Sequence, residues 1–387
     1  MKLFLKTFIS TTICFFIALP LLAKEILVSK QKGSTDRQKF VSAYEKAQKG
    51  DVVIVDMDIV LHNDENPIHI KKNKISIVGK IQGDSLFKIT RTHQKNFLFK
   101  VSSQHINIKN LQFEQGMQQL YFQNEPHTSK KITIENCYFK NGKYTGINFK
   151  GKYKNVLIKN CTFNNTKFSL QTMDCPVLEN FVIDTCQFIK GDHQISLDNP
   201  HANIVKHKNI HIKNCSFGFA SRFNIALANT QNVCIENSNF KGGTGSYAQA
   251  LHFEDRTKNV LVKNNKIECM ADVAILLYAT DKIGHGTGRK LTEEEKYASG
   301  SGNVTLINNQ ITSGMADAAI SIGYGQGYLK ITGDNVIQSK KEAIKSFKSA
   351  KNIQLMIDDH TFINGKRYDE IKTLLDSKEK ERYLKIK

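Results

Sequence analysis

The 387-residue chain contains no tryptophan and only five prolines, and its eight cysteines include no CxxC pair. The lack of closely spaced cysteine or histidine pairs argues against a zinc site. The absence of tryptophan weakly disfavours a site built to stack neutral sugars. After residue 23 no apolar stretch approaches the length of a membrane-spanning helix, so no membrane insertion is expected.

A short phrase recurs along the chain about every 25 residues, a period typical of stacked repeats. It consists of alternating apolar residues followed by Asn-Cys-x-Phe or a close variant. The clear copies begin at Ile132, Val156, Phe181 and Ile210. Fainter copies begin at Val233, Val260, Val304, Leu329 and Ile353. Because one such unit cannot bury its own apolar face, the copies are expected to stack on one another.

The apolar residues of each copy alternate, which is the two-residue period of a strand and excludes a helical solenoid. About ten residues later a second short alternating run follows, for example GlyIleAsnPhe from Gly146 and AlaLeuHisPheGlu from Ala250. Two or three strands per repeat, with no helix between them, predict a parallel β-helix.

Two columns of residues recur at fixed places in this repeat. Asparagines that can bond from rung to rung, at about 4.8 Å, are Asn136, Asn160, Asn214, Asn237, Asn264 and Asn308. The adjacent column contains Cys137, Cys161, Cys186 and Cys215. We expect these cysteines to be small buried hydrophobes without disulfide bridges, because their side chains would point in parallel.

Over most of residues 35 to 365 this pattern resembles the right-handed parallel β-helix proteins of the pectate-lyase-like superfamily. The resemblance implies an all-β, single-stranded right-handed solenoid. It implies no single activity, since the superfamily includes polysaccharide lyases, glycoside hydrolases, epimerases and non-catalytic surface proteins. The segment that starts at Asp36 resembles the N-terminal capping helix of such folds, with Phe40, Ala43, Tyr44 and Ala47 on its buried face.

Three segments are expected along the chain. Residues 1–23 have two lysines before an apolar run that ends in LeuLeuAla, which is typical of a cleaved secretory signal peptide. Residues 24–365 form the β-helix domain with its N-terminal cap, and residues 366–387 form a charged C-terminal helix or tail. The mature protein is therefore expected to be secreted or periplasmic. It is also expected to be a monomer.

The formal net charge of +19 indicates a polyanionic partner. Export and the absence of a basic stripe interleaved with aromatic residues argue against nucleic acid. An acidic polysaccharide is the expected partner. The longest interruption of the repeat, from Asp281 to Gly302, leaves the end of a second strand and is expected to wall a groove beside it.

The alternation in the second strands predicts which side chains face that groove. The inward column contains Ile147, Leu170, Ile195, Ile225, Leu251 and Ile275. One outward column then contains Asn148, Gln171, Ser196, Ala226, His252 and Leu276. The next outward column contains Lys150, Met173, Asp198, Ala228, Glu254 and Tyr278, and a preceding column contains Ser169, Gln194 and Asn224.

A sugar-sized depression is expected at the two alanines of these columns. His252 is a candidate general base or acid, with Glu254, Asp198 and Tyr278 as further catalytic candidates. Asp198 and Glu254 are also candidate calcium ligands, and calcium is the only cofactor considered. The candidate substrate-binding residues are Arg222, Asn224, Lys150, Gln171, His193 and Arg256.

The leading hypothesis is a lyase that cleaves a uronic-acid-containing polysaccharide by β-elimination. Such a reaction needs a group that neutralises the substrate carboxylate, a base and a proton donor. One alternative is a glycoside hydrolase that uses the carboxylates of the same face. The other is a non-catalytic β-helix that binds glycans or forms part of a surface assembly.

Overall fold

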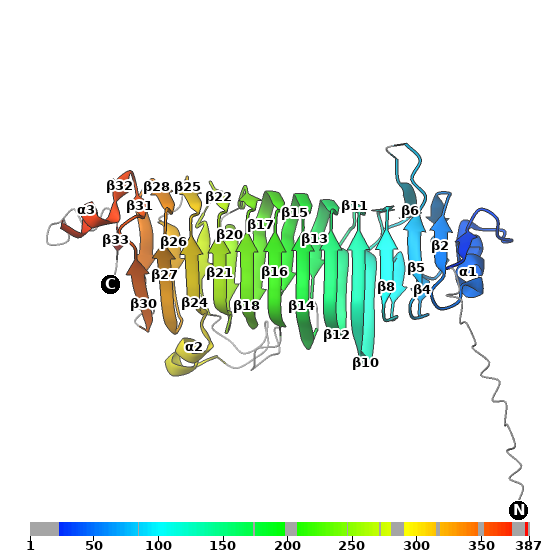
Figure 1. The fold of residues 1–387 in the computed structure, drawn as a ribbon, viewed down its shortest axis with the longest axis horizontal. Coiled ribbons are helices and arrows are strands. Elements are labelled where there is room, and N and C mark those ends of the chain that lie inside the picture. Colours follow the sequence, from blue (N-terminus) through cyan, green and yellow to red (C-terminus); the bar gives the residue numbers. More distant parts are fainter. Residues whose placement is uncertain are drawn as a thin grey trace, which may run out of the picture.

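The computed structural model describes residues 23–83, 85–172, 175–197, 207–245, 247–270, 272–279, 290–314, 318–346, 352–373 and 384–385. The strands stack in parallel along one axis, so the chain forms the predicted parallel β-helix (Figure 1). Each coil contributes strands to three faces, which we call A, B and C in the order in which a coil passes through them. Successive coils pair through parallel ladders on every face.

Face A carries the apolar phrases of the repeat. Its strands are β1 (Glu25–Leu27), β2 (Val52–Val55), β5 (Ser76–Gly79), β8 (Ile106–Lys109), the second half of β10 (Gln118–Glu135), the second half of β12 (Thr145–Lys159), β14 (Val177–Asp184), β16 (His207–Lys213), β18 (Thr230–Glu236), β21 (Lys258–Lys263), β24 (Gly302–Ile307), β27 (Gly327–Thr332) and β30 (Ile353–Ile357).

Face B follows after a sharp bend. Its strands are β3 (Ile59–Leu61), β6 (Phe87–Arg91), β9 (Leu111–Glu114), β11 (Tyr138–Lys140), the first halves of β13 (Thr162–Gln171), β15 (Gln187–Leu197) and β17 (Ser216–Ala228), then β19 (Asn239–Phe240), β22 (Lys266–Cys269), β25 (Gln310–Ser313), β28 (Val336–Ser339) and β31 (Phe362–Ile363). The short β32 (Lys366–Arg367) pairs antiparallel with β31.

Face C contains the second strand runs that the sequence analysis singled out. Its strands are β4 (Ile68–Ile70), β7 (Phe99–Val101), the first halves of β10 and β12, the second halves of β13, β15 and β17, then β20 (Gln249–Glu254), β23 (Ile275–Leu277), β26 (Ala318–Ile322), β29 (Glu342–Ser346) and β33 (Leu384–Lys385).

The bends between faces explain the asparagine columns. Between faces A and B, all six asparagines predicted to stack have φ between 51° and 55°. This left-handed conformation is disfavoured for most side chains and tolerated by asparagine. Amide bonds between rungs are present at part of the column, from Asn136 to Asn110 at 3.1 Å and from Asn264 to Asn237 at 3.4 Å.

A second asparagine column, between faces C and A, was not predicted. After the first member, each side-chain amide donates to the asparagine of the preceding rung at 2.9–3.2 Å. Its members are Asn155, Asn180, Asn209, Asn232, Asn259 and Asn303. Their φ values are also positive, so the same backbone requirement selects the residue type.

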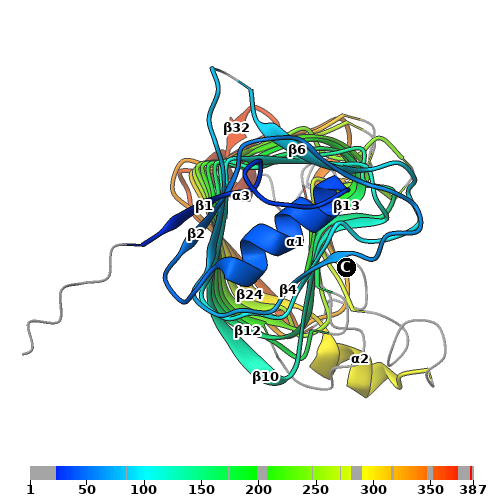
Figure 2. The same cartoon turned by 90° about the vertical axis from the view of Figure 1, so that its right-hand side faces the viewer.

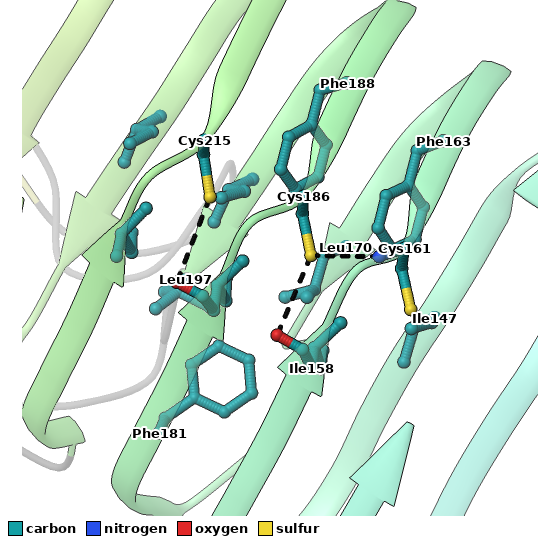
Figure 3. Close-up of a cluster of buried hydrophobic side chains, with 14 of the residues drawn as sticks. Ile147, Ile158, Cys161, Phe163, Leu170, Phe181, Cys186, Phe188, Leu197 and Cys215 are labelled. Carbon is teal, nitrogen blue, oxygen red and sulfur yellow. Dashed lines mark hydrogen bonds between the residues drawn. The ribbon is translucent and has the colours of Figure 1, made fainter. Parts of the chain in front are cut away.

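The interior is filled by columns of identical side chains. From Phe113 to Phe240, six phenylalanines stack face to face at 4.5–5.2 Å, one from each successive coil. The four cysteines of the predicted column are at most 2% exposed and carry free thiols, which confirms both expectations for them. Figure 3 shows Cys161, Cys186 and Cys215 among the buried side chains. Each thiol lies against backbone carbonyls of its own or the preceding coil, as between Cys186 and Ile158 at 3.7 Å.

Helix α1 (Asp36–Lys46) lies at the N-terminal end of the solenoid, where Figure 2 shows it across the end of the coils. Its N-cap residue Thr35 accepts a hydrogen bond from the Gln38 backbone, and Phe40, Ala43 and Tyr44 are buried as predicted. The Phe40 ring lies 5.4 Å from the Phe99 ring in the core. Whether α1 acts as a cap stays a prediction.

The remaining helices are short. Helix α2 (Glu293–Ser299) lies in the long insertion and begins with a capping box between Thr292 and Glu295. Helix α3 (Tyr368–Thr373) follows β32 within the segment predicted as a C-terminal helix or tail. Among the described residues, no helix is long and apolar enough to cross a membrane. Residues 1–22 lie outside the described part, so the signal peptide stays a prediction.

Candidate functional site

A groove of about 460 Å³ lies on face C, over strands β13, β15, β17 and β20. It is lined by Phe168, Gln171, His193, Ser196, Arg222, Phe223, Ala226, Leu227, Ala228, His252, Glu254 and Tyr278. Six of the predicted site residues therefore lie in one depression around the two alanines, together with Ser196 of the predicted outward column. The six are Gln171, His193, Arg222, His252, Glu254 and Tyr278. Small side chains at Ala226 and Ala228 leave its floor open between larger neighbours, as the sequence analysis expected.

The strand register confirms the phase on which this prediction depended. The whole predicted inward column is buried, with no exposure. On the outward side, Gln171 pairs with Ser196, Ser196 with Ala226, and Ala226 with His252. Ala228 pairs with Glu254 in the next column. Asp198, a catalytic and calcium candidate, lies outside the described residues together with Met173.

The third predicted column is wrong. Ser169, Gln194 and Asn224 are fully buried, because the chain bends at the start of each face C strand and turns these side chains inward. The Asn224 amide donates to Gln194 at 2.8 Å and accepts from the Gly242 backbone at 2.9 Å. Asn224 therefore closes the corner between faces B and C and does not face a ligand in the groove.

His252 is held by acceptors at both ring nitrogens. Its Nε2 lies 2.9 Å from Glu254 Oε2 and its Nδ1 lies 3.0 Å from Gln249 Oε1. The Gln249 amide nitrogen donates to Asp272 at 3.0 Å, which orients its oxygen toward His252 and fixes a proton on Nδ1. The proton that can move is consequently the one shared by Nε2 and Glu254.

A column of six rings, one from each coil, runs along face C, and all of its members except Tyr144 line the groove. Its members, here called the ring column, are Tyr144, Phe168, His193, Phe223, His252 and Tyr278. Neighbouring centroids are 4.6–5.2 Å apart from Tyr144 to His252, and 6.5 Å apart between His252 and Tyr278. Cations lie over it: the Arg222 guanidinium is 5.0 Å from the Phe223 ring, and Lys167 is 5.7 Å from the Phe168 ring.

His193 is neutral in this setting. Burial is the main cause that lowers its pKa to about 4, and the neighbouring Asp192 carboxylate, 3.3 Å away, opposes this only in part. It therefore contributes an uncharged ring to the groove. His193 lines the groove, and the substrate-binding role expected for it stays a prediction.

Two other substrate-binding candidates lie elsewhere. Lys150 and Arg256 are not among the described residues that line the groove. The Lys150 carbonyl accepts a hydrogen bond from the Tyr153 hydroxyl at 2.8 Å, and the Arg256 backbone donates to the Ser299 carbonyl. Arg256 thus contacts the root of the long insertion.

The groove as described offers one carboxylate, Glu254, and one of its oxygens is engaged by His252. Calcium prefers six to eight oxygen ligands. The described lining residues therefore do not make a calcium site.

A second groove, of about 1060 Å³, is lined mainly by residues that immediately precede the face C strands, and no ring of the column is among its described lining residues. Its lining includes Lys143, Lys167 and Lys190 against the single carboxylate of Asp192. The exposed Phe219, 53% accessible, lies among these lysines. This surface suits an anionic ligand with apolar patches.

The insertion begins and ends beside the groove. Both of its roots meet at Tyr278, whose carbonyl accepts from the Ser301 backbone at 3.3 Å. No residue of its described part, 290–302, lines the groove. Residues 280–289 lie outside the described residues, so the predicted wall is not tested.

Comparisons with known proteins agree with this architecture. Residues 58–210 match the family model "Right handed beta helix region". The chain is a right-handed parallel β-helix protein. No curated protein matches it in sequence.

Solved structures similar to this β-helix include the Streptococcus pneumoniae surface protein and adhesin PfbA, with a TM-score of 0.62 and 15% identity over 88% of this chain and 97% of that one. The A-module of the Azotobacter vinelandii mannuronan C-5 epimerase AlgE6 has a TM-score of 0.51 and 12% identity, over 87% and 98%. A tailspike protein of E. coli bacteriophage HK620 has a TM-score of 0.57 and 10% identity, over 86% and 63%. At these identities the likeness concerns the fold.

The ring column is the part of the site that sequence reasoning missed. Its signal is an aromatic or histidine residue two positions before the inward residue of three successive coils, at Phe168, His193 and Phe223. The other three rings, Tyr144, His252 and Tyr278, occupy different positions in the strand register. Phe223, for example, pairs with Gln249 and not with His252, so the alignment of these rings is visible only in the folded structure.

Proposed function

We propose that this β-helix binds an acidic polysaccharide along the groove on face C and cleaves it by β-elimination. The observation that carries the proposal is the hydrogen-bonded pair His252 and Glu254. The His252 ring lies next to Phe223 in the ring column, and the Arg222 guanidinium lies over the Phe223 ring. These groups combine an apolar surface, a fixed cation and a proton acceptor within one sugar-sized depression.

The substrate class follows from shape and charge. The row of rings gives the groove an apolar strip along which consecutive sugars can lie, and tryptophan is not needed to provide it. Arg222 can hold a carboxylate in a bidentate fork. The lysines of the second groove, together with the net charge of +19, favour a polyanion over a neutral glycan.

The reaction steps use the described side chains. Arg222 neutralises the uronate carboxylate, which makes the adjacent C5 proton more acidic. When the bound sugar separates the pair, the shared proton leaves with the Glu254 carboxyl group, and the free Nε2 accepts the C5 proton while Nδ1 stays bonded to Gln249. The C5–H electron pair forms the C4–C5 double bond, the C4–O bond breaks, and the leaving oxygen takes a proton from the Tyr278 hydroxyl.

The second candidate function is glycan binding without chemistry. The observation in its favour is that both nitrogens of His252 already have partners, as in a purely structural histidine. A hydrolase would need a second carboxylate near Glu254, and the described lining residues do not supply one. The similar structures carry names of both kinds, a mannuronan C-5 epimerase and a surface adhesin.

The deciding experiment separates binding from chemistry. The purified mature chain is incubated with a panel of acidic polysaccharides, including polymannuronate, and absorbance of unsaturated uronates is followed alongside reducing ends and binding. Rising ultraviolet absorbance supports the lyase. New reducing ends without absorbance would indicate a hydrolase, and binding alone would indicate the non-catalytic protein.

Two further expectations belong to the same proposal. Residues 1–23 direct export, so that the protein meets extracellular or periplasmic glycans. Helix α1 shields the first coils from solvent and from pairing with other strands, as open solenoid ends require.

A further inference from the structure

Three residues of metal-binding type meet on the outer side of face A, away from both grooves. His211 lies on β16, and Cys234 and Glu236 lie on the neighbouring β18. The parallel register places His211 directly beside Cys234, and Glu236 follows two positions later on the same side of the sheet. One ligand atom from each residue lies within 4.8 Å of the other two.

We propose that His211, Cys234 and Glu236 form a zinc site with a fourth position open to water. Imidazole nitrogen, thiolate sulfur and carboxylate oxygen are the three ligand types that zinc takes in proteins. The ligand set is too soft for calcium or magnesium, because it includes a thiol and a single carboxylate. This site does not rest on the proposed polysaccharide activity.

The geometry of the cluster leaves room for a shared ion. The His211 Nε2 to Glu236 Oε1 distance is 2.8 Å, so a small separation of the two atoms admits a metal between them. Both residues are partly buried, with side chains 35% and 22% exposed, which restricts their rotamers. The parallel ladder holds the two strands at fixed spacing, so the three ligands are preorganised.

Cys234 differs from the other cysteines that the structure describes. The remaining six are buried, whereas Cys234 is partly exposed on the outer surface. Burial and the nearby Glu236 raise the pKa of its thiol, so without metal the sulfur keeps its proton. Zinc binding would therefore release a proton, and affinity would rise with pH.

The charges around the cluster are mixed. The register places Lys213 and Lys263 on either side of Glu236, and their positive charges oppose a cation. The Lys213 ammonium lies 3.8 Å from Asp184 on the preceding coil, which offsets part of that charge. The uncharged Val182 and Leu261 lie beside His211 and Cys234.

Sequence spacing concealed this site. His211 and Cys234 are one coil apart, so they do not form the closely spaced pair whose absence argued against zinc. In a solenoid, residues one repeat apart along the chain become lateral neighbours. A bound ion would join β16 to β18 across this coil boundary.

The test uses the mature chain, free of any histidine tag, and Co²⁺ as a coloured probe for zinc. One equivalent of Co²⁺ should give a thiolate-to-cobalt absorption band, and Zn²⁺ should abolish it. Cys234→Ser should eliminate the band. His211→Asn and Glu236→Gln should each weaken Zn²⁺ binding by at least about 10-fold, since even changes outside the ligands cost that much.

A thiol reagent gives an independent readout in the folded protein. Cys234 should react first, and Zn²⁺ should slow its reaction in the wild type and not in His211→Asn. As a matched control, His360→Asn on an exposed turn should bind Zn²⁺ like the wild type. Unchanged Zn²⁺ affinity in the folded variant that carries all three substitutions, or no thiolate band with Co²⁺, would overturn the proposal.

Discussion

His193 stacks on Phe168 with ring centroids 4.6 Å apart and 20° between the ring planes. Burial in this stack lowers the pKa of His193 to about 4. Between roughly pH 6.5 and pH 4, His193 is therefore protonated in the unfolded chain and neutral in the folded chain. Stability contributed by the neutral ring is present above pH 6.5 and is lost as the pH falls. Between pH 7 and pH 5 the loss should be about 2 kcal/mol.

His193→Phe keeps a ring in the column and removes the titration. Between pH 7 and pH 5 the free energy of unfolding, measured in urea, should fall less for this variant than for the wild type. The difference between the two decreases should be about 2 kcal/mol, the part that His193 contributes. His360→Phe, on an exposed turn, should follow the wild type. Parallel pH curves for wild type and His193→Phe would show that His193 is charged in the folded protein.

Phe188 lies in the middle of the stacked phenylalanine column, 4.9 Å from Phe163 and 4.7 Å from Phe217. Removing this ring from a fully packed interior leaves a cavity, so Phe188→Ala should cost about 3–5 kcal/mol. Phe219→Ala removes a ring that is 53% exposed and should cost far less. If Phe188→Ala and Phe219→Ala unfolded at the same denaturant concentration, the phenylalanine column would not contribute to stability as expected.

The fold could be predicted because its main determinants are periodic. Alternation within a run fixes which side of a strand is apolar, and repetition from coil to coil fixes the register, as at Ile195 and Ile225. The asparagine positions followed from the same period. The reason for the residue type, a positive φ at each bend, is a property of the backbone that the sequence pattern alone did not reveal.

The site was predicted only as far as strand alternation holds. His252 and Glu254 lie in regular strand and face the groove as expected. Asn224 sits at the corner where the strand begins, so its side chain points inward despite the alternation. The ring column and the His211 and Cys234 pair depend on contacts between coils, which require the register of the folded chain.

The three lysines of the second groove should contribute to binding through charge. Replacing Lys143, Lys167 and Lys190 together with glutamine should weaken binding of an acidic polysaccharide at low salt by about 5- to 30-fold, from roughly 1–2 kcal/mol for three exposed contacts. The difference should shrink as ionic strength rises, because these charges are exposed. Affinity is measured by titration calorimetry at two salt concentrations.

A matched variant controls for net charge. It replaces three exposed lysines outside the two grooves, Lys30, Lys32 and Lys330. This variant carries the same total charge as the groove variant and should bind nearly like the wild type. If both variants lose affinity equally, the protein attracts polyanions through its overall charge, and the second groove has no specific part in binding.

The pair His252 and Glu254 decides between an enzyme and a binding protein. His252→Asn keeps a polar group near the position of Nδ1 but removes the ring with the proton acceptor Nε2, so it should lower the rate of unsaturated uronate formation by about 10²- to 10⁴-fold. Glu254→Gln should also lower the rate, since the amide cannot exchange a proton with Nε2. Polysaccharide affinity should stay within a few-fold in both variants, because Arg222 and the rings beside the pair remain. Ultraviolet assays and calorimetry on the same preparations separate the two effects, with His360→Asn as the reference for a histidine far from the groove. Loss of affinity in step with the rate would assign the pair to binding alone, and unchanged rates in both variants would remove it from the reaction.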